Sequence, residues 1–226
     1  TLRRQLDDPA SALRAVAASD DVTTFNRHYL YEELDQVASA FTLERARYYA
    51  DRLLRAALEV RTGAINDINL NRWKEYGDIL TDSLWLFDRR DASGAHRAGY
   101  WGNFVPQIPH QLMRRYTRRG DLVIDPFAGS GTTLIEGRRL GRHAIGVELQ
   151  AEVVEQTRAT LAAEPDRHGS VCALEVGDST AFDWRAALGR YGRRSAQLAI
   201  LHPPYFDIIR FSDDPRDLAN APSVDL

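Results

Sequence analysis

The stretch DPFAGSGTT (125–133) limits the possible folds more than any other part of this 226-residue chain. It follows the apolar run LVI (122–124) and precedes LIEGRRL (134–140), so the pattern predicts a strand, a glycine-rich turn and a helix. Such a turn brings backbone N–H groups at a helix N-terminus close to a polar or anionic ligand. The stretch therefore predicts a ligand-binding turn in an α/β fold.

The chain after residue 100 alternates between strand patterns and helix patterns. Strands are predicted at 122–125, 143–149, 171–176 and 197–202, and helices at 106–120, after the glycine turn, at 150–164 and around 181–189. Right-handed crossovers between such units give a parallel sheet with helices on both faces. We therefore expect residues 100–226 to form a Rossmann-like, doubly wound, mainly parallel α/β sheet, with ligands bound beyond the carboxyl ends of its strands.

Residues 1–99 lack this alternation and are predicted to form a mainly helical N-terminal region. TLERARYYADRLLRAALEVRTG (42–63) places Thr42 at the N-cap and Gly63 just after the helix, with an apolar stripe between them. DILTDSLWLF (78–87) fits either a short helix or a strand. DASGAHRAG (91–99) is typical of a connection between domains, so we expect the boundary at its end.

The composition narrows the class of protein. The formal net charge is −3, which gives no strongly basic character, although local arginine clusters still suit phosphate contacts. Cys172 is the only cysteine, so neither a disulfide framework nor a cysteine-based metal site is expected. We find no signal peptide and no apolar run long enough to span a membrane. We expect a soluble, cytoplasmic protein without a metal centre or a membrane partner.

The glycine turn differs from two well-known phosphate-binding turns. A phosphate-binding NTPase loop needs a lysine after its last glycine, whereas Gly131 is followed by Thr132. The GxGxxG pattern of dinucleotide oxidoreductases is also absent, because the turn offers only Gly129 and Gly131. This second difference excludes a dinucleotide less firmly than the first excludes an NTPase.

Acidic residues near the strand ends point to a different ligand. Asp125 would repel a pyrophosphate, but it suits the ammonium group of an amino acid. Glu148 follows 23 positions later, close to the spacing of about 20 residues at which an acidic side chain reaches ribose hydroxyls. A nucleoside joined to an amino acid through a sulfonium is S-adenosylmethionine.

Three segments together resemble the amino-group DNA methyltransferases, which methylate N6 of adenine or N4 of cytosine. They are DPFAGSGTT, the strand end GVEL (146–149) and HPPY (202–205), in the order that places cofactor binding before catalysis. YWGNFVPQIPHQLMRRY (100–116) is similar to the segment that precedes the glycine turn in this family. The resemblance covers roughly 100–210 and implies a class I methyltransferase fold, S-adenosylmethionine as the cofactor, and double-stranded DNA with a flipped target base.

The resemblance also implies a role for each matching residue. The residues implied to bind the cofactor are Asn103, Phe104, Asp125, Phe127, Gly129, Gly131, Thr132, Glu148 and Asp178. Among them, Glu148 would hold the ribose hydroxyls, Asp178 would bond the adenine amino group, and Asn103 and Phe104 would line the other side. The residues implied to be catalytic are His202, Pro203, Pro204 and Tyr205.

The HPPY segment suits methylation of an amine. An exocyclic amine is a poor nucleophile, because its lone pair is delocalised into the ring. An acceptor at His202 and the backbone carbonyl of Pro203 would bond its two N–H groups and favour a tetrahedral nitrogen whose lone pair points at the methyl group. Tyr205 would stack on the base. Methylation of cytosine C5 is excluded, since it needs a cysteine nucleophile and Cys172 lies in the third strand.

His202 stands where the family usually has Asp, Asn or Ser. A neutral imidazole still offers one acceptor nitrogen, so the role survives while the choice between adenine and cytosine stays open. Two rival functions also stay open. One is an RNA or protein-glutamine amino-methyltransferase, and the other is a non-catalytic DNA- or cofactor-binding subunit of a restriction or phage-defence complex.

The part of the chain after HPPY is short for this family. The family's sheet continues with three more strands, and residues 206–226 contain only turn-like pieces such as DDPRD (213–217). The strand at 197–202 would then form an exposed edge, which natural proteins avoid. We therefore expect an incomplete sheet, with a longer native polypeptide or another chain completing the fold.

Overall fold

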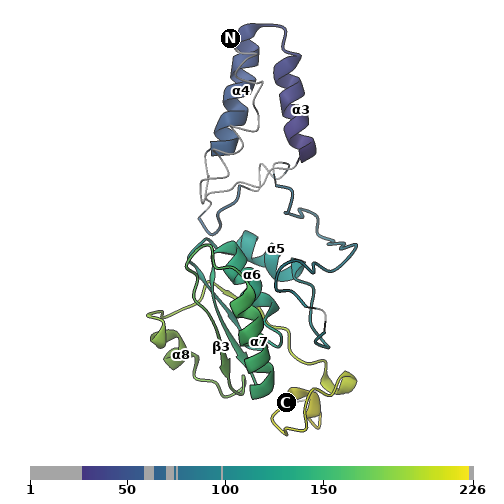
Figure 1. The fold of residues 1–226 in the computed structure, drawn as a ribbon, viewed down its shortest axis with the longest axis vertical. Coiled ribbons are helices and arrows are strands. Elements are labelled where there is room, and N and C mark those ends of the chain that lie inside the picture. The colour runs from purple at the N-terminus through teal and green to yellow at the C-terminus, as the bar shows by residue number, and fades with distance from the viewer. Residues whose placement is uncertain (1–26, 59–63, 70–73, 75, 98, 224–226) are drawn as a thin grey trace. The chain divides into compact units, whose positions relative to one another are not determined.

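The computed structural model describes residues 27–58, 64–69, 74, 76–97 and 99–223 (Figure 1). Contacts within the chain divide it into two units. The first contains Thr1–Arg61 and Asn69–Thr81, and the second contains Thr62–Ile68 and Asp82–Leu226. The boundary expected at residues 99 and 100 stays a prediction.

The first unit contains a helical hairpin made of α3 (Arg27–Ala38) and α4 (Leu43–Leu58) (Figure 1). Thr42 caps α4 as predicted, because its Oγ1 accepts a hydrogen bond from the backbone N–H of Arg45 at 3.2 Å. Arg52 of α4 forms an ion pair with the buried Glu33 of α3, which ties the two helices together. Gly63 and residues 1–26 lie outside the described residues.

Residues 78–87 form neither the helix nor the strand that the sequence allows. Trp85 donates its indole N–H to the backbone carbonyl of Asp82 at 3.0 Å, a local bond that competes with regular structure. Leu84 and Leu86 are 69% and 74% exposed, so this apolar run faces no core. Both alternatives were therefore wrong, because the run lacks a partner surface.

The second unit is built on a four-stranded parallel sheet in the order β3-β2-β1-β4. The strands are β1 (Leu122–Asp125), β2 (His143–Glu148), β3 (Cys172–Val176) and β4 (Leu198–Ala199). The helices are α5 (Gln107–Tyr116), α6 (Thr132–Leu140), α7 (Ala151–Ala163) and α8 (Trp184–Arg190) (Figure 1). This arrangement confirms the predicted Rossmann-like parallel sheet.

Neighbouring residues of the central strands pack against opposite layers of helices, since side chains alternate along a strand. On one face, Val123 of β1 packs with Met113 of α5. On the other face, Leu122 of β1 and Ile145 of β2 pack with Leu188 of α8. A third cluster joins α6 and α7 to the first face; its buried members are Ala95, Ala128, Leu134, Ile135, Ala144, Val154, Leu161 and Leu174. The sheet is therefore covered on both faces, as a doubly wound fold requires.

β4 is shorter than the predicted strand at 197–202. The backbone N–H of Ile200 still donates to the carbonyl of Ile124 at 2.9 Å, but Pro203 and Pro204 have no N–H to continue the ladder. HPPY therefore leaves the sheet as a loop at the carboxyl end of β4. Two short 3-10 turns, η2 (Phe206–Ile208) and η3 (Leu218–Asn220), follow it, and the described residues contain no strand after β4.

The outer edge of β3 is covered by an arginine. The carbonyl of Val171 accepts the N–H of Ala144 at 2.8 Å, and the N–H of Gly177 donates to a carbonyl of β2 at 3.0 Å. Odd-numbered residues of this strand therefore pair with β2, and Leu174 faces outward. Its carbonyl accepts two hydrogen bonds from Arg158 of α7, from Nε at 3.2 Å and from Nη2 at 2.8 Å.

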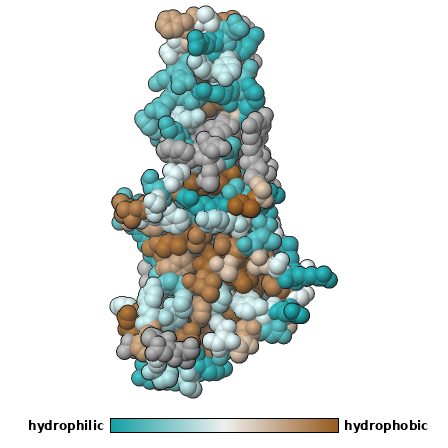
Figure 2. Space-filling view, turned by 180° about the vertical axis from the view of Figure 1, so that it is seen from behind, coloured by the Kyte–Doolittle hydropathy of each residue, from teal (hydrophilic) through white to brown (hydrophobic). Residues whose placement is uncertain are grey.

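Large apolar side chains are exposed at several places on the molecule, as the brown areas of Figure 2 illustrate. Leu201, Tyr205 and Ile208, in and beside the HPPY loop, are 61%, 54% and 75% exposed. None of the described helices is long and apolar enough to cross a membrane.

Candidate functional site

A pocket opens at the carboxyl ends of the four strands of the second unit. Most of the site residues predicted from the sequence line it, and each of them follows or ends a different strand or belongs to the segment before α5. These lining residues are Asn103, Phe104, Phe127, Gly129, Glu148, Asp178, His202, Pro203, Pro204 and Tyr205. The topology thus brings together side chains that are up to about a hundred positions apart in the sequence.

Asp125, Gly131 and Thr132 were also predicted to bind the cofactor, but they do not line the pocket. Asp125 is 1% exposed, and its Oδ1 accepts the N–H of Phe127 at 3.0 Å. Thr132, the first residue of α6, donates its hydroxyl to Oδ1 of Asn103 at 2.5 Å. These residues hold the glycine turn and the opposite wall in place, and their direct contact with a ligand stays a prediction.

Both glycines of the turn are required by conformation and by space. Gly129 has a φ of 48°, and a Cβ there would lie 2.9 Å from the ring of Tyr100. Gly131 precedes α6 with a φ of 75°, and a Cβ there would lie 2.6 Å from Cγ2 of Thr157. Any other residue at either position would be strained and would also collide with its neighbour.

Glu148 connects the end of β2 to the glycine turn. Its Oε2 accepts the N–H of Gly129 at 3.1 Å, and its Oε1 accepts the N–H of Gln150 at 2.9 Å. Burial raises the pKa of this carboxyl, which is 8% exposed. Each oxygen keeps further acceptor capacity, so the carboxylate can bond ligand hydroxyls while it holds the turn.

The charges around the pocket favour a cationic ligand. Its charged lining residues are Glu148, Asp178 and Asp217 on the acidic side and Arg216 on the basic side. The hydroxyl and N–H of Thr180 donate to Oδ1 of Asp178 at 2.7 and 2.9 Å, which lowers the pKa of that carboxyl. Carboxylates therefore outnumber basic groups in the lining at neutral pH.

Burial raises the pKa of Asp125 to about 6. This carboxyl is therefore ionised in most molecules at pH 7 and becomes neutral in most molecules below pH 6. Its position behind the turn adds to the negative potential of the pocket only in the upper part of this range.

One wall of the pocket is held by Arg90, which the sequence analysis missed. Nη1 of Arg90 donates to the backbone carbonyls of Asn103 and Phe104, at 3.2 and 2.7 Å. No sequence signal separates this arginine from the adjacent Arg89. Its role depends on contacts 13 and 14 positions along the chain, in a segment without helix or strand periodicity.

The aromatic rings of the HPPY loop and the opposite wall meet inside the pocket. The rings of Phe104 and His202 have centroids 4.9 Å apart and are tilted by 44°. Nε2 of His202 lies 2.6 Å from the hydroxyl oxygen of Tyr205, and these two rings are nearly perpendicular at 86°. Burial lowers the pKa of His202, so the neutral imidazole that can accept a hydrogen bond is favoured.

The segment after HPPY closes another side of the pocket, which the sequence analysis did not foresee. Phe211 stacks on Tyr100 with centroids 6.1 Å apart and an angle of 20°. Asp217 is buried and accepts hydrogen bonds from the hydroxyl of Ser212 at 2.8 Å and from the N–H of Ala219 at 3.0 Å. The only sequence signal here was the charged run DDPRD, interpreted as turn-like.

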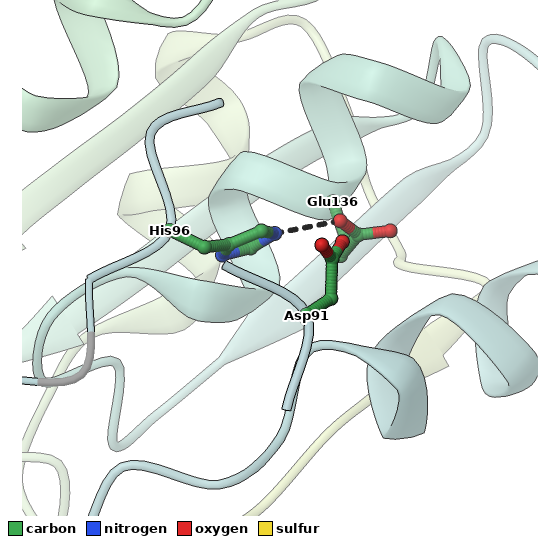
Figure 3. Close-up of side chains that lie close together, drawn as sticks. All are labelled: Asp91, His96 and Glu136. Carbon is green, nitrogen blue, oxygen red and sulfur yellow. Dashed lines mark hydrogen bonds and ion pairs between the residues drawn. The ribbon is translucent and has the colours of Figure 1, made fainter. Parts of the chain in front are cut away.

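A second polar cluster lies away from the pocket lining, where Asp91, His96 and Glu136 offer ligand atoms within 4.8 Å of one another (Figure 3). Nε2 of His96 is 2.7 Å from Oε1 of Glu136. The positive charge in this cluster comes from Arg139, whose Nη1 lies 3.2 Å from Oδ2 of Asp91 and 3.3 Å from Oε1 of Glu136. A guanidinium thus already compensates the carboxylates, and the expected lack of a metal centre stays a prediction.

Glu136 is the centre of this cluster and joins three segments. His96 and His110 contact different oxygens of its carboxylate, His110 through Nδ1 at 2.8 Å. Burial alone would raise the pKa of Glu136, but the hydrogen bonds from His110 and His96 outweigh burial and lower the pKa to about 2. The cluster therefore fastens the segment before α5, and α5 itself, to the helix that follows the glycine turn.

Comparison with known proteins gives one match over most of the chain and several shorter ones. A model of the protein family described as DNA methylase matches residues 18–159, which is more than half of the chain. The Type II methyltransferase M.MjaII of Methanocaldococcus jannaschii is 42% identical over 73 residues, which cover 32% of this chain and 13% of that protein. The Type II methyltransferase M2.DpnII of Streptococcus pneumoniae is 35% identical over 100 residues, which cover 42% of this chain and 34% of that protein.

The matched part of the chain thus spans about a third or less of the length of these curated relatives. Among solved structures, the DNA modification methylase TTHA0409 from Thermus thermophilus, in complex with S-adenosyl-L-methionine, is 38% identical to this chain. The match covers 33% of this chain and 30% of that chain, with a TM-score of 0.29. This score is too low to establish a common structure over the whole length.

Proposed function

The chain belongs to the N6/N4 DNA methylase family, and from this premise we propose that it transfers a methyl group from S-adenosylmethionine to the exocyclic amine of adenine or cytosine in double-stranded DNA. The observation that carries the proposal is the meeting of the glycine turn, the acidic strand ends and the HPPY loop in one pocket. Because DNA is the proposed substrate, we propose the same compartment for the enzyme, the cytoplasm of a cell without a nucleus.

The residues of the pocket fit S-adenosylmethionine. Glu148 has acceptor capacity for the two ribose hydroxyls beyond the N–H groups that it already binds. Asp178 is an acceptor for the adenine amino group, and Asn103 and Phe104 form the opposite wall. The excess of carboxylates suits a sulfonium cation, which supplies the electrophilic methyl group when the cofactor is bound.

The HPPY loop is proposed to bind and orient the target amine. The lone pair of neutral His202 accepts one N–H of the amine, and the backbone carbonyl of Pro203 accepts the other. The nitrogen lone pair is then free of hydrogen bonds and available to the methyl group. Phe104 supports the imidazole from the other side of the pocket, and the exposed Tyr205 stacks on a base that has left the duplex.

The proposal is tested by incubating the protein with S-adenosylmethionine labelled in the methyl group and with genomic DNA, RNA or a protein mixture in parallel. Digestion of the DNA to nucleosides should yield labelled N6-methyladenine or N4-methylcytosine, and this result also decides between the two bases. Label found only in RNA or protein would contradict DNA as the substrate. Tight cofactor binding without transfer to any of the three would identify a non-catalytic subunit.

Replacing Tyr205 by alanine should remove base stacking, which is worth about 1–3 kcal/mol. Methyl transfer at low DNA concentration should then fall by about 5- to 150-fold, while the affinity for S-adenosylmethionine measured by calorimetry stays nearly unchanged. Tyr116→Ala is a matched control, because Tyr116 is half-exposed and does not line the pocket. An equal loss of cofactor affinity in Tyr205→Ala would place this ring in the cofactor site instead.

The rate of methyl transfer should fall at acidic pH. Protonation of His202 removes its acceptor lone pair, and burial lowers its pKa below the ordinary value of 6.5, so the loss should have its midpoint below pH 6.5. Asp125 titrates near pH 6, and the rate must therefore be measured at saturating cofactor. The His202→Asn variant is the control, since its amide has no proton to gain in this range. The same acid loss in both proteins would remove His202 from this role.

A further inference from the structure

The hydroxyl of Tyr205 already occupies the nitrogen of His202 that the proposed reaction uses. Nε2 and the hydroxyl oxygen are 2.6 Å apart, and the described residues offer His202 no other hydrogen bond. Phe104 packs on the same imidazole with a centroid distance of 4.9 Å. The ring is thus positioned from two sides, by one apolar contact and by one directional bond.

The chemistry of the two groups decides which one donates. Neutral imidazole carries one N–H and one lone pair, whereas a phenol is donor and acceptor at the same atom. A phenolic O–H is more acidic than the N–H of neutral imidazole, and the imidazole lone pair is the stronger acceptor. The hydroxyl of Tyr205 therefore donates to Nε2, and the ring proton of His202 lies on Nδ1.

We propose that the Tyr205 hydroxyl is a positioning group that holds His202 in the tautomer with an acceptor at Nε2, and that the target amine takes its place when a base enters the pocket. This inference rests on the proposed function and adds to Tyr205 a role separate from stacking. The amine N–H replaces the phenolic O–H at the same nitrogen, so opening the contact leaves no polar group of His202 without a partner.

Tyr205 is free to move between these two states. Its side chain is 54% exposed, while its ring meets His202 only edge-on, at an angle of 86°. Rotation of the ring away from His202 turns its face toward an incoming base and releases Nε2 in the same movement. A phenylalanine at this position would keep the stacking face and lose the positioning bond.

The tautomer of His202 can be observed without any substrate. In ¹⁵N-labelled protein, long-range ¹H–¹⁵N correlation distinguishes protonated from unprotonated ring nitrogens, and the signal that disappears in His202→Asn identifies this ring among the six histidines. We expect an unprotonated, hydrogen-bonded Nε2, and a mixture of tautomers in Tyr205→Phe. A proton on Nε2 in the unmodified protein, or an unchanged pattern in Tyr205→Phe, would overturn the proposal whether or not the protein methylates DNA.

A double-mutant cycle then tests the link to the reaction. Tyr205→Phe should lower the single-turnover rate of methyl transfer by about two- to tenfold, the range for one net hydrogen bond, with unchanged affinity for the cofactor. In the His202→Asn background the same substitution should change the rate by less than about twofold, because an amide oxygen accepts without tautomers. An equal fall in both backgrounds would show that the hydroxyl does not act through His202. Absence of transfer by the unmodified protein would instead contradict the proposed function.

Discussion

Glu136→Ala is expected to lower the free energy of unfolding by about 3–5 kcal/mol, the cost of removing one partner from a buried ion pair. The carboxylate is 2% exposed and contacts His96, His110 and Arg139. Without it, these groups lose the acceptor that joins them, and a cavity forms in α6. Urea unfolding followed by circular dichroism measures the change, and a loss below about 1 kcal/mol would show that the cluster contributes little to stability.

Two comparisons separate this effect from a general effect of the substitution. Glu152→Ala removes an exposed carboxylate from α7 and should change the stability by less than about 0.5 kcal/mol. The pH dependence supplies the second comparison. The pKa of Glu136 is lowered from 4.5 to about 2, so the stability from this ionisation is complete above pH 4.5 and disappears as the pH falls toward 2. Glu136→Ala should lack this part of the acid destabilisation.

The second large effect is expected from Glu148→Ala, which should weaken binding of S-adenosylmethionine by about 1–3 kcal/mol, or about 5- to 150-fold. The carboxylate is proposed to bind the ribose hydroxyls, and it also anchors the N–H groups of Gly129 and Gln150. Its removal therefore takes away a ligand contact and loosens the turn beneath it. Isothermal titration calorimetry measures the affinity directly.

The smaller change Glu148→Gln distinguishes the charge from the hydrogen bonds. Its amide oxygen keeps an acceptor for one of the two backbone N–H groups, so the fold of the turn should survive while the negative charge is lost. Glu152→Ala again serves as the exposed control. Unchanged affinity in Glu148→Ala, with the fold intact, would remove Glu148 from the cofactor site.

The parallel sheet could be predicted because its strands are buried apolar runs and its turn is marked by glycines. Both signals are local, so β1, the glycine turn and β2 lie within a residue or two of their expected positions. β4 ended earlier than predicted because the two prolines of HPPY, read only for their catalytic meaning, also remove ladder donors. At 78–87 the apolar letters were present, but no core surface faces them.

The candidate site could be predicted where the chemistry lies at strand ends, as with Glu148, Asp178 and His202. It could not be predicted where the contacts join distant irregular segments. Arg90 and Asp217 belong to such segments, and neither shows a period or a motif that indicates its partner. Glu136 was equally invisible, because its two histidine partners lie 40 and 26 positions away along the chain.

The arginine at the edge of β3 gives the sheet a direction of growth. A strand from another molecule that approached this edge would need the carbonyl of Leu174, which Arg158 already occupies with two hydrogen bonds. Edge-to-edge association is therefore blocked on this side, in the way that natural sheets guard against aggregation. Any added strand must instead lie beside β4, whose chain continues directly into HPPY. Assembly at that side would touch the base-binding loop, so the event that lengthens the sheet would also be felt by the groups that hold the target amine.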